Sequence, residues 1–148
     1  MNPVQTPDTL EIAAERLIAI SAAMRFVQQE IARAAERPVH VLLSGEPGSG
    51  RHVIARAIHA QSKFAKGPFV AIDCARRAPN DLEAQLFATT GNRTGVERRS
   101  LERVRRTAHL LQSKGGTLFL QNAVDLPARI QLRLIRVLRD GEVVIMDD

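Results

Sequence analysis

The sequence lacks several residue types, and each absence limits what the protein can do. It has no tryptophan, no tyrosine and five phenylalanines, so few aromatic rings are present on which the bases of a single-stranded nucleic acid could stack. Its one cysteine, Cys74, cannot form an intramolecular disulfide, and its four histidines show no metal-ligand spacing, so we expect no metal. No apolar run is long enough for a membrane-spanning helix. Residues 1–8 lack the basic start and apolar stretch of a signal peptide. We therefore expect a cytoplasmic protein with no membrane partner.

The remaining composition is that of a folded chain. The 148 residues are 45% hydrophobic and 25% charged, which is typical of a globular protein and not of a disordered one. The length is sufficient for one domain with its own core. We expect residues 1–8 to form a disordered tail and residues 9–148 to form a single domain.

Positive charge is concentrated in the second half of the chain. Residues 93–139 carry 11 Lys and Arg against 3 Asp and Glu, whereas residues 1–92 carry 10 against 9. Such an excess of arginine attracts phosphate, nucleic acid or an acidic protein, and it also occurs on solvated helix surfaces without any partner. Both interpretations of the arginine-rich segment Arg93–Arg106 stay open.

Hydrophobic periodicity predicts helices that alternate with apolar strands. The expected helices are residues 9–20, 21–36, 53–59, 80–87, 100–113 and 127–140, and the expected strands are residues 39–44, 69–73, 117–121 and 143–146. Ser21 is the expected N-cap of the second helix. Strands that are apolar throughout are typical of a parallel sheet covered by helices on both faces. The sequence therefore predicts an α/β fold, with three layers and a parallel sheet of about four strands.

A glycine-rich segment lies between the first expected strand and the helix that follows it. It has the spacing of a phosphate-binding loop, whose backbone N–H groups and following helix N-terminus hold phosphates. Its candidate residues are Gly45, Glu46, Pro47, Gly48, Ser49, Gly50, Arg51 and His52.

Two substitutions in this loop argue against ordinary nucleotide chemistry. Arg51 stands where the motif has lysine, and His52 stands where it has the magnesium-binding hydroxyl. Arginine is a planar fork and does not replace the compact lysine charge. We expect weak phosphate binding, increased by protonation of His52 as the pH falls toward about 6.

The strand over residues 117–121 ends in two amides, Gln121 and Asn122. Enzymes that transfer phosphoryl groups place acids near such a strand end, to hold magnesium and activate water. An amide supplies neither the charge for magnesium nor a site for a proton near neutral pH. Glu46 and Asp125 are the carboxylates left nearby in the sequence.

With these residues in hand, the chain resembles the sigma-54 interaction domain, the AAA+ ATPase of bacterial enhancer-binding transcription activators. The resemblance covers about residues 15–146 and rests on several motifs. The family's G-E-x-G-T-G-K-E loop and A-R-A-I-H helix resemble residues 45–52 and 55–59. Its G-P-F-V-A-x-N-C-A run resembles residues 67–75. Its G-G-T-L-F-L-D-E run resembles residues 115–120 and departs at Gln121 and Asn122.

The resemblance implies a P-loop NTPase core with further departures. The family's E-L-F-G becomes residues 85–88. From the resemblance we expect the chain to lack the family's sensor residues, arginine finger, helical lid and helix-turn-helix, and a receiver domain in front. The family's sigma-contacting G-A-F-T-G-A loop corresponds to a degenerate loop with arginine in place of phenylalanine, formed by Gly91, Asn92, Arg93, Thr94, Gly95 and Val96.

Three functional hypotheses follow. The first is a degenerate sigma-54-type regulator without catalytic residues, which binds ATP or ADP weakly and acts on an AAA+ regulator or a two-component system protein, with sigma-54 itself not expected as a partner. The second is an active ATPase in which other carboxylates replace the missing acids. The third is a module that binds nucleic acid or an acidic protein through Arg93–Arg106.

Overall fold

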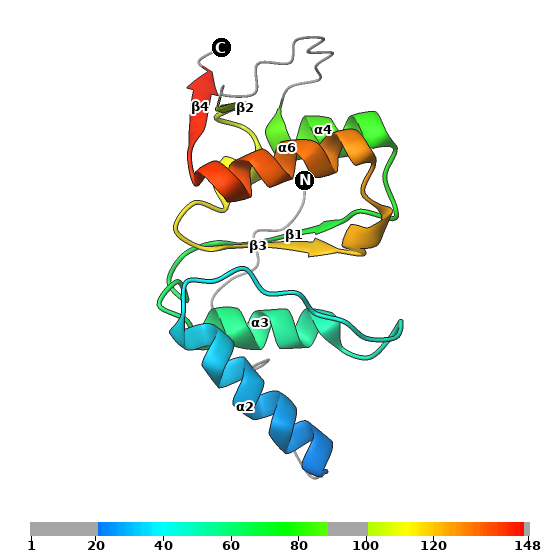
Figure 1. Cartoon of the computed structure of the whole chain (residues 1–148), viewed down its shortest axis with the longest axis vertical. Coiled ribbons are helices and arrows are strands. Elements are labelled where there is room, and N and C mark those ends of the chain that lie inside the picture. The colour runs from blue at the N-terminus through cyan, green and yellow to red at the C-terminus, as the bar shows by residue number, and fades with distance from the viewer. Residues whose placement is uncertain (1–20, 89–100, 147–148) are drawn as a thin grey trace. The chain divides into compact units, whose positions relative to one another are not determined.

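The computed structural model describes residues 21–88 and 101–146 (Figure 1). Contacts divide the chain into two compact units, which are described separately: residues 1–69 with 115–117, and residues 70–114 with 118–148. The helices are α2 (Ala22–Glu36), α3 (Arg51–Gln61), α4 (Pro79–Phe87), α5 (His109–Gln112), the 3-10 helix η1 (Ala123–Asp125) and α6 (Ala128–Asp140). The strands are β1 (Phe69–Asp73), β2 (Glu102–Arg105), β3 (Thr117–Gln121) and β4 (Val143–Met146).

In the first unit, helices α2 and α3 pack against each other. The predicted cap of α2 is confirmed, because the Ser21 hydroxyl accepts a hydrogen bond from the Met24 N–H at 3.2 Å. Ile31 and Ala35 of α2 are buried, as are Ala55 and Ala57 of α3. The predicted helices over residues 21–36 and 53–59 are therefore confirmed, whereas the predicted helix over residues 9–20 lies outside the described residues.

The strand predicted over residues 39–44 is not formed. The segment has no regular secondary structure, and Val39, Val41 and Leu42 are exposed. A strand needs a neighbour to receive its backbone hydrogen bonds, and among the described residues the paired strands are β1 with β3 and β2 with β4. An apolar, β-branched sequence alone therefore does not produce the strand.

Two glycines allow two chain segments to cross at backbone contact in the first unit. A Cβ atom on Gly67 would lie 2.0 Å from the carbonyl oxygen of Gly115, and one on Gly116 would lie 2.0 Å from that of Pro68. The Thr117 N–H donates to the Pro68 carbonyl at 2.8 Å, directly beyond the crossing. Only glycine fits at either position.

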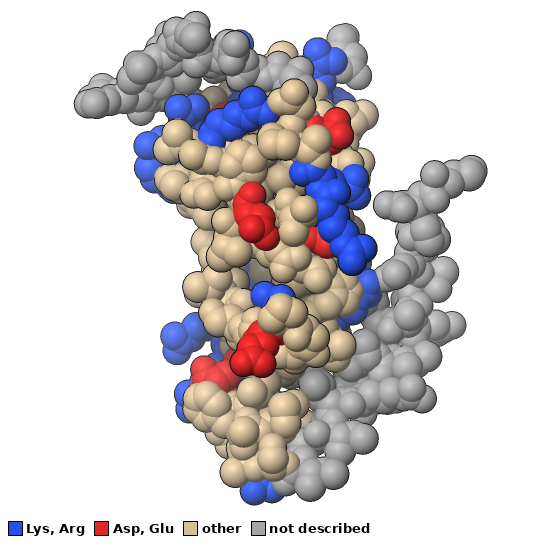
Figure 2. All heavy atoms as spheres, turned by 90° about the vertical axis from the view of Figure 1, so that its right-hand side faces the viewer, with Lys and Arg blue, Asp and Glu red and all other residues tan. Residues whose placement is uncertain are grey.

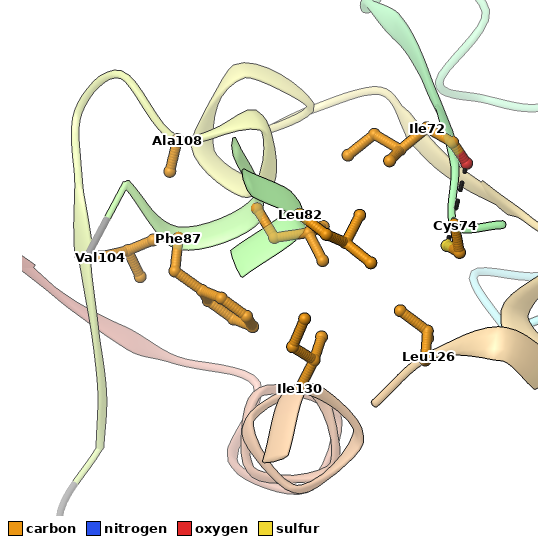
Figure 3. Close-up of a cluster of buried hydrophobic side chains, with 9 residues drawn as sticks. Ile72, Cys74, Leu82, Phe87, Val104, Ala108, Leu126 and Ile130 are labelled. Atoms are coloured by element: carbon orange, nitrogen blue, oxygen red, sulfur yellow. Dashed lines mark hydrogen bonds between the residues drawn. The ribbon is translucent and has the colours of Figure 1, made fainter. Parts of the chain in front are cut away.

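In the second unit, β1 and β3 run side by side in the same direction. Their pairing extends to the Cys74 N–H, which donates to the Gln121 carbonyl at 2.9 Å. Ile72 of β1 lies in a core with Leu82 and Phe87 of α4 and Ile130 of α6 (Figure 3). The strands over residues 69–73 and 117–121 and the helices over residues 80–87 and 127–140 were predicted and are confirmed. The α/β class with parallel strands is likewise correct.

The helix predicted over residues 100–113 is wrong. Residues 102–105 form β2, which pairs in parallel with β4, Glu102 beside Val143 and Arg105 beside Met146. Side chains of β2 alternate between buried and exposed, which is the period of a strand. Only the four-residue helix α5 remains of the predicted helix. The four described strands consequently form two sheets of two strands, not the single predicted sheet.

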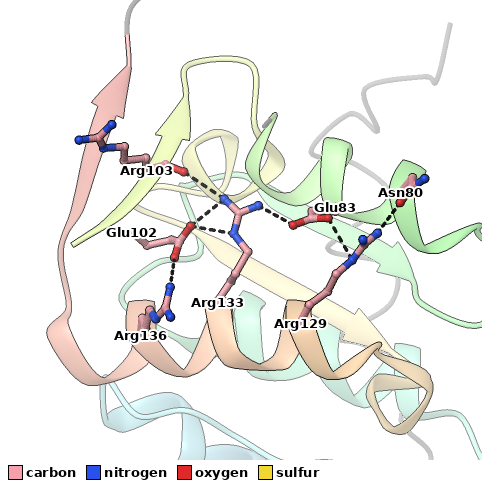
Figure 4. Close-up of polar contacts among 7 residues, drawn as sticks. All are labelled: Asn80, Glu83, Glu102, Arg103, Arg129, Arg133 and Arg136. Carbon is pink, nitrogen blue, oxygen red and sulfur yellow. Dashed lines mark hydrogen bonds and ion pairs between the residues drawn. The ribbon is translucent and has the colours of Figure 1, made fainter. Parts of the chain in front are cut away.

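Arg133, whose side chain is 13% exposed, joins α4, β2 and α6 (Figure 4). The Arg133 guanidinium lies 2.9 Å from a carboxylate oxygen of Glu83 and 2.7 Å from one of Glu102. Both carboxylates are almost fully buried, with 4% and 8% of their side-chain surface exposed. The guanidinium also stacks on the Phe87 ring, 3.8 Å from its centre.

Two half-exposed arginines of α6 complete this group. Arg129 pairs with Glu83 at 3.2 Å, and Arg136 pairs with Glu102 at 3.5 Å. Two carboxylates are thus shared by three arginines, and we call these five residues the arginine network. Buried carboxylates need such partners because an unpaired charge inside a protein is costly.

Candidate nucleotide site and family membership

The glycine loop forms a tight turn that leads into α3. The Ser49 N–H donates to the Glu46 carbonyl at 3.1 Å, which closes the turn. Gly48 and Gly50 both have φ of +82°, a left-handed conformation that favours glycine. Gly45 is held close as well, since a Cβ there would lie 2.5 Å from the Ser49 hydroxyl. The predicted loop residues 45–52 are therefore brought together as one backbone turn.

Helix α3 begins at Arg51, directly after this turn. Gly50 is its N-cap and supplies no side-chain hydrogen bond, so the first N–H groups of the helix are not capped by a side chain. Uncapped N–H groups at a helix N-terminus, together with the helix dipole, favour an anion. The start of α3 therefore has the local geometry that favours an anion, although the strand expected before the glycine loop is not formed.

His52 does not face an anion in the way that the sequence suggested. Its Nε2 accepts a hydrogen bond from the Arg56 Nε–H at 2.8 Å, and its ring lies edge-on to Phe69. Accepting at Nε2 requires the neutral ring. Burial, and then the charge of Arg56, lower the pKa of His52 from its ordinary value. The gain of positive charge at His52 toward pH 6 stays a prediction, and the lowered pKa shifts this protonation to a lower pH than for an ordinary histidine.

The same side of α3 carries a second histidine. His59 is buried, with Nδ1 2.8 Å from the Thr117 hydroxyl. Burial and the charge of Arg56 lower its pKa as well. Arg56 itself lies over the Phe69 ring, 4.8 Å from the centre. The lowered pKa values favour the neutral form of both histidine rings near neutral pH.

The amides at the end of β3 belong to the second unit, and one of them contacts Asp73, which is not among the predicted site residues. Asn122 has a left-handed backbone with φ of 54°, and its Nδ2 donates to the Asp73 carboxylate at 2.9 Å. That carboxylate also accepts from the Ala75 N–H at 3.1 Å and lies 3.3 Å from the Arg76 Nε. The Asp73 carboxylate is thus surrounded by three donors, from Asn122, Ala75 and Arg76.

Asp73 could have been found from the motifs. The family motifs quoted above have asparagine at position 73 and glutamate at position 122, whereas this chain has aspartate and asparagine. The carboxylate and the amide have exchanged positions between β1 and the end of β3, and in this chain they are joined by a hydrogen bond. Each motif taken by itself points to Glu46 and Asp125 as the nearby carboxylates, and only the two motifs together point to Asp73.

Gln121 and Cys74 complete this strand end. The Gln121 backbone carbonyl accepts a hydrogen bond from the Cys74 N–H. Burial, and then the carboxylates of Asp73 and Asp125, raise the pKa of the Cys74 thiol to about 11. A protonated, buried thiol is not a nucleophile near neutral pH, which agrees with a structural role for Cys74.

Other predicted residues lie elsewhere. The loop formed by residues 91–96 is outside the described residues. Within the described ranges, no group of three or more His, Cys, Asp or Glu is arranged to hold a metal ion. In the same ranges, no helix is both long and apolar enough to cross a membrane.

Comparison with known proteins gives the family. Residues 17–147 of the chain match the family described as the Sigma-54 interaction domain. The chain belongs to this family. It is 37% identical over 145 residues to the DNA-binding transcriptional regulator NtrC of Rhizobium meliloti, and 40% identical over 124 residues to the transcriptional regulatory protein XylR of Pseudomonas putida.

Solved structures support the same relationship. A crystal structure of NtrX from Brucella abortus in complex with ADP matches 95% of the chain, with 29% identity and a TM-score of 0.74. The ATP complex of NtrX matches 93% with a TM-score of 0.70. The chain spans 31% of the length of either NtrX chain, 29% of NtrC and 21% of XylR. It is thus a sigma-54 interaction domain sequence that covers less than a third of these regulators.

Proposed function

We propose that this sigma-54 interaction domain is catalytically inactive, binds nucleotide phosphates at most weakly, and acts through contacts with another protein. The observation that carries the proposal is the hydrogen bond of Asn122 to Asp73. An amide stands where phosphoryl transfer needs a base, and the neighbouring carboxylate is held by Asn122, the Ala75 N–H and Arg76. Asp73 is therefore occupied by donors and is a poor substitute base.

The glycine loop supports weak binding of phosphate rather than none. Its turn and the start of α3 keep the backbone geometry that anions favour. Arg51 adds positive charge, and its side chain packs back over Gly45, with Cγ 3.7 Å from the position of a Cβ there. Gln121 and Asn122 offer amides in place of the carboxylates that magnesium prefers, so the metal-dependent part of nucleotide affinity is lost.

Membership in the sigma-54 interaction domain family indicates the class of protein partner that we propose. A catalytically inactive domain that keeps the fold can pack against an active AAA+ regulator or a two-component system protein. Sigma-54 itself is not the expected partner, because Arg93 replaces an apolar phenylalanine in the loop that resembles the sigma contact, and a buried unpaired guanidinium is costly. A cytoplasmic location remains a prediction.

Calorimetric titration tests the binding part of the proposal. ADP and ATP, each with and without magnesium, should bind the wild-type chain weakly and with little dependence on magnesium. Arg51→Gln should weaken binding further, whereas Arg37→Gln, which removes an exposed charge at the end of α2, should not. Strong binding that requires magnesium would contradict the proposal.

A further inference from the structure

The outer side of α6 carries a row of apolar side chains. Leu132, Ile135 and Leu138 are each more than half exposed, whereas Ile130 of the same helix is fully buried in the core. Because the three follow one another at intervals of three residues, they lie along one side of the helix over about 9 Å. Single exposed apolar residues are ordinary, but a contiguous row of large ones indicates a surface that binds another molecule. We call these three residues the α6 stripe.

Half-exposed arginines border the α6 stripe. Arg129 and Arg136 lie three and four residues from Leu132. Arg139 lies four residues from Ile135. These are the spacings of neighbours on a helix surface. The three arginine side chains are 48%, 45% and 56% exposed, so a molecule bound on the stripe also contacts guanidinium groups.

The acids that pair with these arginines are much less exposed than the arginines themselves. Glu83 and Glu102 are almost fully buried, and Figure 4 shows them on the side of α6 that faces α4 and β2. Asp140, which pairs with Arg139, is 20% exposed. Acidic side chains do reach the surface in Figure 2, where they lie among basic ones, so the burial of the two glutamates is a local feature. The charged groups of α6 that reach the surface are thus mainly guanidinium groups.

We propose that the α6 stripe binds an amphipathic helix of a partner protein, whose apolar row is bordered by glutamate or aspartate. The inference rests on the proposed function, in which the domain acts through contacts with another protein, and it names the surface and the chemistry of that partner. Apolar residues of the partner helix pack on the stripe. Its carboxylates accept hydrogen bonds from the guanidinium groups of Arg129, Arg136 and Arg139.

A helix fits this surface better than a strand does. The backbone N–H and carbonyl groups in the interior of a helix are bonded within that helix, so α6 offers no edge with which a strand could pair. Apolar side chains three and four residues apart on a partner helix match the three-residue intervals of the α6 stripe.

A second copy of this chain is a poor occupant of the stripe. Helix α6 has four arginines and one aspartate, so two copies packed stripe to stripe would bring arginines beside arginines. Three large side chains are also far short of the total of about 1,600 Å² that a typical stable interface buries. A lipid surface is disfavoured because anchors at a membrane interface are mainly tryptophan and tyrosine, and the chain has neither.

Fluorescence anisotropy with a labelled synthetic peptide tests the proposal on the full chain. A peptide of about 20 residues is long enough to form a helix, and it carries leucines at alternating three- and four-residue intervals with glutamates on either side. This glutamate peptide should bind the wild type, and its affinity should fall between about 50 and 300 mM salt because exposed charges are screened. A second peptide with lysines in place of the glutamates should bind about tenfold more weakly or less.

The double variant Leu132→Gln, Ile135→Gln removes the centre of the α6 stripe. It should weaken binding of the glutamate peptide about tenfold or more, because two large apolar side chains are no longer buried by the peptide. The matched control is Leu42→Gln, Val124→Gln, which alters two other strongly exposed apolar residues and should bind like the wild type. Far-ultraviolet circular dichroism should show both variants folded.

Absence of glutamate-peptide binding by the wild type, equal loss in both variants, or equal binding of the lysine peptide would overturn the proposal. So would a wild-type dimer in analytical ultracentrifugation, or binding to phosphatidylserine vesicles, that the stripe variant loses. Hydrolysis assays separate the two proposals. Magnesium-dependent ATP hydrolysis by the wild type contradicts the proposed function whatever the peptide does, whereas a lack of peptide binding by an inactive chain contradicts only the inference on α6.

Discussion

Replacement of Arg133 by methionine tests whether the arginine network holds α4, β2 and α6 together. Methionine fills a similar volume and keeps the packing on Phe87, but it removes the charge that lies 2.9 Å from Glu83 and 2.7 Å from Glu102. The two carboxylates are 4% and 8% exposed and cannot recover their hydration without local opening. The substitution should therefore be strongly destabilising.

The expected loss of unfolding free energy in Arg133→Met depends on the ion pairs that Glu83 and Glu102 retain. Removing one partner of a buried ion pair costs about 3–5 kcal/mol. Glu83 keeps Arg129 and Glu102 keeps Arg136, both of which are about half exposed and therefore weaker partners. We expect a loss near the lower end, about 3 kcal/mol of unfolding free energy. This is a large part of the stability of a small protein.

Urea unfolding followed by circular dichroism measures this loss, and hydrogen exchange of peptides from α4, β2 and α6 locates it. Arg139→Met on the same helix is the matched control, because its partner Asp140 forms an exposed pair with it, and it should leave the midpoint unchanged. Adding Glu102→Gln to Arg133→Met should restore part of the loss. A wild-type midpoint for Arg133→Met, or an equal shift for Arg139→Met, would refute the reasoning.

Three further predictions concern other parts of the chain. Gly67→Ala should destabilise the fold by about 3 kcal/mol, because its Cβ would lie 2.0 Å from the Gly115 carbonyl oxygen. In Gly48→Ala the new Cβ meets nothing within 4 Å, so this variant should lose only about 1 kcal/mol from the strain of its positive φ. Thermal melts should show this order of stability. Phosphate affinity should stay constant as the pH falls to the ordinary pKa of histidine, about 6.5, and increase only below it, because the pKa of His52 is lowered; an increase already above that pH in calorimetry would contradict the hydrogen bond from Arg56. Cys74 should resist iodoacetamide at pH 8 until urea exposes it, because burial raises its pKa to about 11; rapid labelling of the folded chain would disprove this.

Elements with strong local signals could be predicted from the sequence. Ser21 identifies the start of α2 by its capping hydroxyl, and Gly141 identifies the end of α6 by its positive φ of 67°. The apolar strands β1, β3 and β4 and the helices α4 and α6 follow from periodicity. The resemblance to the family, which the comparisons confirm, was carried by short motifs around these same elements.

The incorrect secondary-structure predictions concern segments whose structure depends on pairing with strands elsewhere in the chain. Residues 39–44 have the composition of a strand but no strand beside them among the described residues. Leu101, Val104, Ala108 and Leu111 fit a helical spacing, yet the pairing of β2 with β4 gives residues 102–105 the period of a strand. Pairing partners far apart in the chain are not visible in a local pattern.

The candidate site likewise has features that could be predicted from the sequence and features that could not. The turn at Gly48 and Gly50 could be predicted, because the motif demands left-handed glycines there. The neutral state of His52 could not, since it depends on Arg56 and Phe69 in the folded chain. Asp73 required two motifs to be compared with each other, because its significance lies in the contact with Asn122.

The most direct test of the central claim is the rate of ATP hydrolysis by the purified wild-type chain with magnesium. Phosphoryl transfer needs a metal site, a positioned water and charge on the transferred group, and the chain has Arg51, Gln121 and Asn122 at the positions that supply them in its family. We predict release of phosphate at the rate of a buffer blank, at any protein concentration. Magnesium-dependent turnover that is abolished by Gly50→Val and by Asp73→Asn would contradict the claim and identify Asp73 as a working replacement for the missing acids.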